Sequence, residues 1–369
     1  MKTRYLPMKK AFRPGVLAAL LLLLAGCAGE QPKPGVIKNP DDPLIGRIFY
    51  HDGPQAITEQ DLYARMADSD VVYLGENHDN IHHHRIQLDS IRKLVEMGHK
   101  PSVGFEFFAR ADTPRLNQHQ ASDDKYHGGQ GEHGDAAGQL LRQQLGWGAN
   151  RDQDWDHLYP ILQYAREQQL PVFGADINAG LRKQISKVGY DGLNGVEKLL
   201  VPLSEFNDDD YRQLMFERFT LAHCGWGKDD YLGRLYDAWL ARNEAMARSI
   251  IAMHEQNPEQ PVVVILGGGH TEYNMAVVER IARLAPGLRQ LNLRLRAVAD
   301  EPIAVTEYFA PLQINETSFG QPYDYQWFTA RMPEREDPCE AFLKYKNKHA
   351  KHAGSDDKPA ADEASKSAE

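Results

Sequence analysis

Four short apolar runs recur along the chain, at residues 70–75, 102–105, 171–175 and 261–266. Each run has four to six residues, is rich in β-branched or aromatic side chains, and is bounded by Gly or Pro. Runs of this kind are typical of parallel strands whose two faces are both covered by helices. The pattern therefore predicts a mainly parallel sheet in the interior of the protein.

Helical patterns separate these runs. Leu88, Ile91 and Val95 recur at intervals of three and four residues, and similar periodicity covers 155–168 and 274–284. A chain that alternates strands and helices in this way is expected to form an α/β fold. We therefore predict an α/β architecture with a mainly parallel sheet flanked by helices.

The longest helical stretch, about residues 109–252, is rich in Tyr, Trp and His. Most of these side chains are expected to be core. Together they predict a large helical insertion that covers the carboxyl edge of the strands, called the helical cover below. Its Gly- and His-rich part, 121–138, is typical of a mobile loop near a site. Two further strands are expected at the sheet edge, at 302–308 and 323–328.

Four of the predicted strands end in ionisable residues. Glu76 and His78 follow the first run, Glu106 the second, Asp176 the third, and His270 the fourth. In open parallel sheets, ligands bind beyond the carboxyl ends of the strands. Four independent helix caps explain this pattern less well than one shared site. We therefore expect these side chains to converge in a single crevice.

Neighbouring residues have simpler explanations. Asp79 is expected to cap the helix that follows it, because short acidic side chains accept hydrogen bonds from the first helical N–H groups. The glycines at 267–269 lack the spacing of a dinucleotide or P-loop phosphate site. We expect them instead to let the backbone turn sharply and present the histidine that follows.

Three consecutive histidines at 82–84 raise the question of a metal site. His78 and His82 are four residues apart and would lie on the same helix face. His83 and His84 would point elsewhere, and we expect them at a solvated helix start. The sequence contains no HExxH and no Gly-x-Ser-x-Gly, which disfavours zincin and serine-hydrolase sites.

The N-terminal residues predict an export signal. Five basic residues and no acid precede an apolar run at 16–24, which is too short to span a bilayer. The following Leu-Ala-Gly-Cys resembles the bacterial lipobox, so residues 1–26 are expected to be removed and Cys27 to carry acyl chains. Two or three such chains make a stable anchor. Ala28, in place of Asp, favours the outer membrane.

Composition divides the mature chain. Residues 27–43 form a Pro-rich tether, 44–345 suffice for one large core, and 346–369 lack large apolar residues and are expected to be disordered. Removal of the five basic signal residues takes the formal charge from −10 to −15, which argues against nucleic acid as a partner. Cys224 and Cys339 are expected either to pair or to remain two buried thiols.

Four motifs stand out along the chain: YLGENHD at 73–79, GFEFF at 104–108, WDHLY at 155–159 and VILGGGH at 264–270. Together they resemble the ChaN family of haem-binding lipoproteins. RNEAMA at 242–247 also resembles the helical arginine motif of the wider superfamily, which includes erythromycin esterases and Tiki/TraB metalloprotease-like proteins. The resemblance spans about residues 44–300.

This resemblance implies a lipid-anchored protein that faces the periplasm, binds haem as its cofactor and supports haem-iron uptake. It suggests a homodimer around stacked haems and an outer-membrane haem receptor as partners. Ferric haem is commonly held by His or Tyr. We expect the ligand on the helical cover, with Tyr126, His127, His157 and Tyr159 as candidates. Arg242 is expected to pair with one of the strand-end acids. The acids and histidines at the strand ends would form a polar floor.

A metal-assisted hydrolase is the alternative function. In that interpretation Glu76 or Glu106 acts as a general base, while His78 and His270 hold a divalent cation or orient a substrate. Carboxylates and imidazoles that converge on one crevice suit either function. The sequence leaves both open.

Overall fold

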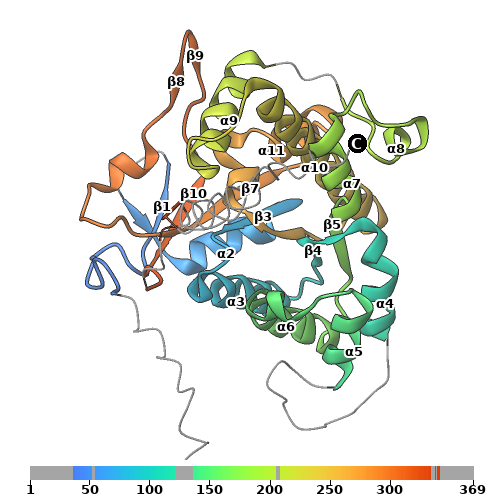
Figure 1. The fold of residues 1–369 in the computed structure, drawn as a ribbon. Coiled ribbons are helices and arrows are strands. Elements are labelled where there is room, and N and C mark those ends of the chain that lie inside the picture. Colours follow the sequence, from blue (N-terminus) through green and yellow to red (C-terminus); the bar gives the residue numbers. More distant parts are fainter. Residues whose placement is uncertain are drawn as a thin grey trace, which may run out of the picture. The chain divides into compact units, whose positions relative to one another are not determined.

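The strands of the computed structural model form a large sheet with helices on both sides (Figure 1). The structure describes residues 36–51, 55–121, 136–204, 208–333, 337 and 339–340. The described residues from Ile37 onward form one compact unit. The predicted signal peptide, Cys27 and the predicted tail at 346–369 lie outside the described residues, as does most of the loop expected at 121–138.

Eight strands make the main sheet: β1 (Ile48–Tyr50), β2 (Ala56–Ile57), β3 (Val71–Glu76), β4 (Ser102–Ala109), β5 (Val172–Asp176), β6 (Val262–Gly267), β7 (Gln290–Ala297) and β10 (Tyr325–Thr329). Their order is β2-β1-β10-β7-β3-β6-β4-β5. The six strands from β10 to β5 are parallel, and β1 and β2 pair antiparallel at one edge. The prediction of a mainly parallel sheet is confirmed, and the four apolar runs are β3 to β6. A separate hairpin joins β8 (Gln313–Ile314) and β9 (Thr317–Ser318).

One α-helix follows each of β3 and β6, and groups of helices follow β4 and β5. The α-helices are α2 (Glu59–Ala67), α3 (Ile81–Glu96), α4 (Thr113–Ala121), α5 (Ala136–Gln144), α6 (Asp152–Glu167), α7 (Ala179–Val188), α8 (Gly195–Leu200), α9 (Asp209–Ala222), α10 (Asp229–Gln256) and α11 (Val277–Leu284). The 3₁₀ helices are η1 (Arg110–Asp112), η2 (Ala149–Arg151), η3 (Gly268–His270), η4 (Glu272–Asn274) and η5 (Val305–Phe309). The helical patterns expected at 155–168 and 274–284 correspond to α6 and α11.

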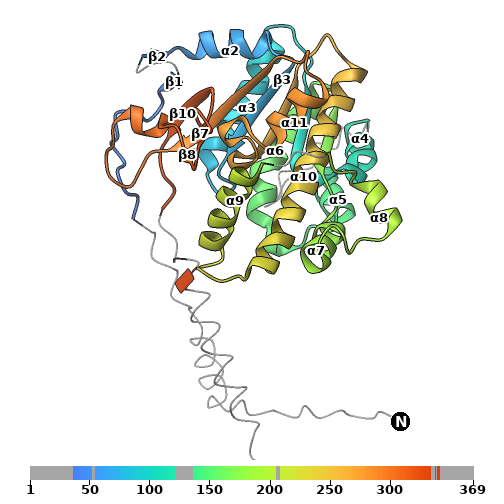
Figure 2. The ribbon, with the colours of Figure 1, turned by 90° about the horizontal axis from the view of Figure 1, so that it is seen from above.

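Two hydrophobic layers lie on opposite faces of the sheet, because successive strand residues point to opposite sides. Leu74 and Phe105 pack with Trp155 of α6 in one layer. Tyr73 and Val264 pack with residues of α10 and α11 in the other. Figure 1 shows α3 and α6 on one side of the sheet and α10 and α11 on the other. The long helix α10 also contacts α7 and α9 (Figure 2). No helix within the described ranges is long and apolar enough to cross a bilayer.

The segment after residue 300 departs from expectation. The strand predicted at 302–308 is wrong, because η5 occupies this region and buries the consecutive side chains Tyr308 and Phe309 in one cluster. A strand would send these neighbours to opposite faces. The strand predicted at 323–328 is confirmed as β10, but it lies between β1 and β7 and not at the edge.

The two cysteines that the sequence left open form a disulfide. Cys224 follows α9, and it is bonded to Cys339, which lies 115 residues further along the chain. The interpretation as two buried thiols is therefore wrong. The bond fixes the chain after β10 to the turn between α9 and α10.

Candidate functional site

The predicted strand-end residues lie together at the carboxyl edge of the sheet. Glu76 ends β3, Glu106 lies in the second half of β4, Asp176 ends β5, and His270 belongs to η3 directly after β6. All four are buried. Arg242 reaches two of them, Glu106 and Asp176, from α10, and the sequence led us to expect a pairing with at least one acid.

Arg242 joins two of the acids. Its Nη2 atom donates to Oε1 of Glu106 at 2.5 Å, and its Nε atom donates to Oδ2 of Asp176 at 2.7 Å. The other oxygen of Glu106 accepts a hydrogen bond from the backbone N–H of Gly267 at 2.6 Å. One guanidinium thus serves two carboxylates, and the three groups together carry one negative charge when both acids are ionised.

Burial and these contacts act in opposite directions on the pKa values of the acids. Burial raises the pKa of Glu106, but His270 and Arg242 outweigh it and hold that pKa well below its ordinary value. For Asp176 burial prevails, and its pKa is raised despite Arg242. Glu106 is therefore a fixed anion, and Asp176 is the acid that takes up a proton first as the pH falls.

His270 is held by three neighbours. Nδ1 of His270 donates to Oδ1 of Asn243 at 2.7 Å, because the Asn243 amide nitrogen already donates to the Trp239 carbonyl. Nε2 lies 3.2 Å from Oε1 of Glu106. The imidazole stacks on the Trp239 ring with centroids 4.1 Å apart, and burial lowers the pKa of His270. His270 is a buried part of the floor.

His78 is more accessible, since 50% of its side chain is exposed. Its Nδ1 atom lies 2.8 Å from Oε1 of the buried Glu76. The second oxygen of Glu76 accepts from Nε2 of Gln87 at 2.7 Å and lies 3.1 Å from Nδ1 of His84. A carboxylate that holds one imidazole nitrogen fixes the tautomer and orients the other nitrogen toward a ligand. Burial lowers the pKa of His78, but Glu76 and Glu106 raise it by more, so its pKa is above the ordinary value.

A cavity of about 790 Å³ borders this floor, called the strand-end cavity below. Besides His78, Glu106, Asp176 and Arg242, its lining includes Phe107, Trp147, Ile177, Arg151 and Arg182. The edge of the His78 ring faces Phe107, with centroids 4.9 Å apart. A concave space of this size with an apolar wall and a few convergent polar groups is typical of a small-molecule site.

Residues of the helical cover contribute to this lining. His157 and Tyr159, the two candidate haem ligands within the described residues, do not. The ring of His157, on α6, stacks on His84 with centroids 4.5 Å apart. Tyr159 is buried in the core, where it stacks on Trp155. Tyr126 and His127 lie outside the described residues. As folded, neither His157 nor Tyr159 lines the strand-end cavity.

The histidines at the start of α3 require a correction. His83 and His84 were expected to be solvated, yet they are 0% and 3% exposed. The first turn of α3 lies against the end of β3, so Nδ1 of His83 accepts from the backbone N–H of Asn77 at 2.9 Å. His84 contacts the Glu76 carboxylate for the same reason.

The start of α3 also differs from the prediction. Asn80, and not Asp79, is the N-cap, and its Oδ1 atom accepts from the N–H of His82 at 3.0 Å. His78 precedes the helix, so it does not share a helix face with His82. Within the described part of the chain, no group of three or more His, Cys, Asp or Glu side chains is arranged to hold a metal ion.

Two of the glycines at 267–269 serve close packing. None of them has a positive φ, so the sharp turn that was expected does not depend on left-handed backbone. A Cβ atom on Gly267 would lie 3.0 Å from Cε1 of His78, and one on Gly268 would overlap the guanidinium of Arg294. The absent side chains leave room for these two residues.

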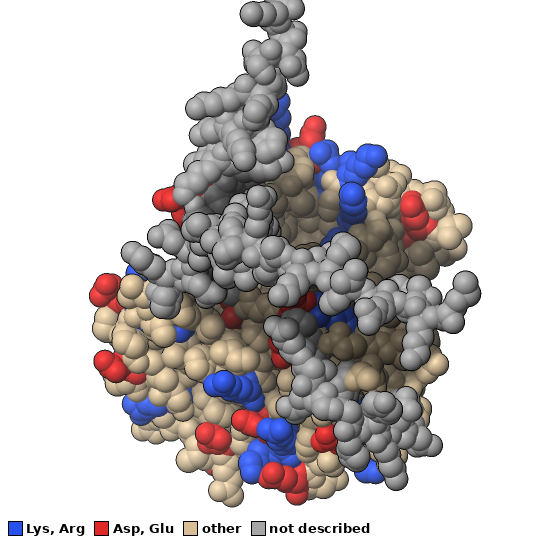
Figure 3. Space-filling view, turned by 60° about the horizontal axis from the view of Figure 1, so that its bottom comes forward, with Lys and Arg blue, Asp and Glu red and all other residues tan. Residues whose placement is uncertain are grey.

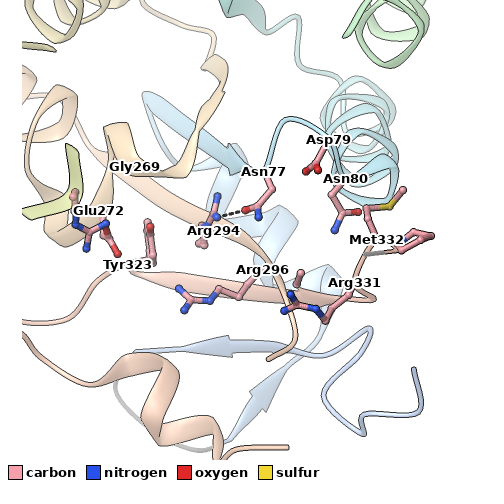
Figure 4. A pocket seen from close by; sticks show the side chains of 13 residues that line it. Asn77, Asp79, Asn80, Gly269, Glu272, Arg294, Arg296, Tyr323, Arg331 and Met332 are labelled. Atoms are coloured by element: carbon pink, nitrogen blue, oxygen red, sulfur yellow. Dashed lines mark hydrogen bonds and ion pairs between the residues drawn. The ribbon is translucent and has the colours of Figure 1, made fainter. Parts of the chain in front are cut away.

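A second cavity, of about 720 Å³, was not expected from the sequence. It is lined by four arginines, Arg218, Arg294, Arg296 and Arg331, and we call it the arginine cavity (Figure 4). Two of them come from β7, whose alternating Leu and polar residues at 291–296 are typical of a strand. That alternation was the signal that could have located them. On the face shown in Figure 3, by contrast, basic and acidic side chains are interspersed.

The chain matches a known protein family. The family model described as "Haem-binding uptake, Tiki superfamily, ChaN" matches residues 62–281, more than half of the chain. The chain belongs to the ChaN family. The wider sequence comparison adds nothing to this, since no curated protein matches the chain.

One solved structure supports the ChaN-like fold. A structure described as cofacial haem binding to ChaN of Campylobacter jejuni has a TM-score of 0.56 and 15% identity, covering 76% of this chain and 95% of that one. A Bacillus cereus protein scores 0.41 with 12% identity, covering 75% and 93% of the two chains. The erythromycin esterase EreC scores 0.39 with 13% identity, covering 81% and 86%. Only the first score is high enough to support the shared fold.

Proposed function

We propose that this ChaN-family protein binds haem in the strand-end cavity, with Nε2 of His78 as a donor to the iron, and serves haem-iron uptake at the cell envelope. One observation carries the proposal. The buried carboxylate of Glu76 holds Nδ1 of a half-exposed His78 at the wall of a cavity of about 790 Å³. Membership of a haem-binding family supports haem as the ligand.

The residues present fit this group. Haem would supply an iron that accepts an imidazole or phenolate donor, and the accessible imidazole is that of His78. Phe107 and Trp147 offer aromatic surface to an apolar ring. Arg182 and Arg151, of which Arg151 also pairs with Asp154, lie in the same lining and suit anionic propionates. Arg242 pairs with both Glu106 and Asp176 and compensates one of their two negative charges.

Each neighbour of His78 has a defined part in this proposal. Glu76 sets the tautomer and increases the basicity of the imidazole. Gln87 fixes Glu76 by donating to Oε2 at 2.7 Å. Gly267 leaves space for the ring, since any Cβ atom there would lie 3.0 Å from Cε1 of His78.

A hemin titration of single variants tests the proposal. His78→Ala should lose most of the Soret shift. Its affinity for hemin should fall by at least about 10- to 100-fold, which is the loss that removal of a residue supporting a metal ligand causes. His82→Ala is the matched control, because His82 is near in sequence and lines neither cavity. Tyr126→Phe and His127→Ala are measured alongside. If one of these two loses binding while His78→Ala retains it, the ligand lies on the helical cover. If the spectrum of hemin does not change when the parent protein is added, haem binding itself is rejected.

The hydrolase alternative is not favoured. A general base works best with a pKa near the operating pH, whereas the pKa of Glu106 is held well below its ordinary value by His270 and Arg242 against the effect of burial. Both oxygens of Glu76 are already engaged, by His78 on one side and Gln87 on the other. Neither carboxylate is arranged to accept a proton from a substrate or water.

The cellular placement is part of the proposal. A lipid-anchored protein of the outer membrane, facing the periplasm, is supported by the lipobox-like residues that end at Cys27. Cys27→Ser should move the protein from the membrane fraction to the soluble periplasm. A variant that remains membrane-bound after signal cleavage would contradict this anchor.

A homodimer around haem is tested by light scattering, which should show a doubled mass only when hemin is present. Delivery from an outer-membrane haem receptor is the proposed upstream step.

A further inference from the structure

The arginine cavity lies beside the strand-end cavity, at the carboxyl ends of β3, β7 and β10. Asn77 lines the arginine cavity, while the next residue, His78, lines the strand-end cavity. The two spaces are therefore separated at the end of β3. Arg294 and Arg296 come from β7, and Arg331 follows β10 (Figure 4).

Arg294 is the least satisfied of these side chains. Its Nη2 atom donates to Oδ1 of Asn77, but its Nε and Nη1 atoms are buried and have no hydrogen-bond partner. Its guanidinium lies over the Tyr323 ring at 5.9 Å from the centroid and against the backbone of Gly268. Burial lowers the pKa of Arg294. Buried guanidinium donors that lack acceptors are costly unless a ligand supplies oxygens.

The charges around the cavity leave an excess of positive charge. Arg218 pairs with Glu272, and Arg331 pairs with Asp300 at 2.6 Å. Arg294 and Arg296 form no salt bridge with any carboxylate in the described part of the chain. The four arginines of the lining outnumber its two acids, Asp79 and Glu272, so a net positive charge remains. This charge would attract an anion.

We propose that the arginine cavity binds a ligand through carboxylate or phosphate oxygens, with Arg294 as the principal donor. A guanidinium is matched to such oxyanions, because its N–H groups lie in one plane and its charge is permanent. Asn77, which directly follows β3, orients Arg294 by accepting its hydrogen bond. Gly268 leaves room for Arg294, because a Cβ atom there would overlap the guanidinium. This site does not depend on haem binding in the strand-end cavity. The oxyanion belongs either to a separate small anion or to the propionates of haem.

The full-length protein is tested first with inorganic phosphate and succinate, at constant ionic strength set with chloride. Thermal unfolding and calorimetry should give a saturable stabilisation of the parent that is at least about tenfold weaker in Arg294→Gln. Arg294→Lys keeps the charge and tests whether the planar donor set matters. Arg289→Gln is the matched control, because it removes an arginine that is 67% exposed and lines neither cavity. It should bind like the parent.

Hemin and its dimethyl ester separate the two sources of the oxyanion. If propionates occupy the cavity, Arg294→Gln should weaken hemin binding but leave the ester unaffected, and phosphate should compete with hemin. If a separate anion occupies it, phosphate or succinate should bind and hemin affinity should not respond to Arg294→Gln. The proposal is overturned if neither anion stabilises the parent and Arg294→Gln, folded by circular dichroism, binds hemin and its ester like the parent.

Discussion

Nδ1 of His78 lies 2.8 Å from Oε1 of Glu76, and the Glu76 side chain is completely buried while half of the His78 side chain is exposed. The buried partner is fixed by Gln87, so the exposed ring has one preferred orientation. A histidine held in this way loses little freedom when it binds a ligand. Glu76 therefore positions His78 as a donor at the end of β3.

Replacing Glu76 by Gln should weaken hemin binding about 10- to 100-fold, because the imidazole loses the carboxylate that fixes its tautomer and increases its basicity. Soret titrations of the parent and the variant measure this effect. Glu96→Gln is the control, since it removes an exposed carboxylate that pairs with Lys93. Unchanged affinity in Glu76→Gln would show that the carboxylate does not position His78.

The pH dependence of hemin binding follows from His78. The imidazole must be unprotonated at Nε2 to donate to iron, and Glu76 and Glu106, acting against burial, raise the pKa of His78 above 6.5. Binding should therefore be complete at high pH and be lost as the pH falls through that raised pKa. The midpoint should move to lower pH in Glu76→Gln. A parent midpoint at or below the ordinary histidine value would contradict the assignment.

The strand-end residues could be predicted from sequence because the signal was local. Glu76, Asp176 and His270 each follow an apolar run, and parallel strands bring such ends to one edge of a sheet. Arg242 was expected near the acids from the resemblance of its helix to a known motif. Its pairing with both Glu106 and Asp176, however, depends on how α10 packs across β4 and β5.

Other features depend on contacts that no local pattern contains. His83 and His84 are buried because the first turn of α3 meets the end of β3, and polar residues at a helix start are usually solvated. The arginine cavity was missed because β7 was not predicted. Its Arg294 is admitted by the absent side chain of Gly268, a relationship between residues 26 positions apart in the sequence.

Replacing Arg242 by Met should destabilise the protein by about 3–5 kcal/mol at neutral pH, because two buried carboxylates are left without their shared cation. Urea unfolding followed by circular dichroism measures the loss. Burial already raises the pKa of Asp176, so Asp176 should take up a proton as the pH falls. This should relieve the repulsion between Asp176 and Glu106, and the difference in unfolding free energy between parent and variant should shrink. Arg92→Met removes an exposed pair with Asp89 and should cost at most about 1 kcal/mol. Equal losses in both variants would argue against the bridging role of Arg242.

Removing the disulfide should lower stability without altering the floor of the strand-end cavity. Cys224 and Cys339 are 115 residues apart in sequence, and cross-links that close long loops stabilise a protein by about 2–4 kcal/mol, mainly by restricting the unfolded chain. The double variant Cys224→Ser with Cys339→Ser should therefore unfold at lower urea concentration. The parent treated with reductant should behave in the same way, whereas reductant should not affect the double variant. Hemin affinity should be unchanged in all three samples, because neither cysteine lines either cavity. Parent protein that migrates identically on gels with and without reductant, and unfolds at the same urea concentration in both conditions, would contradict the bond.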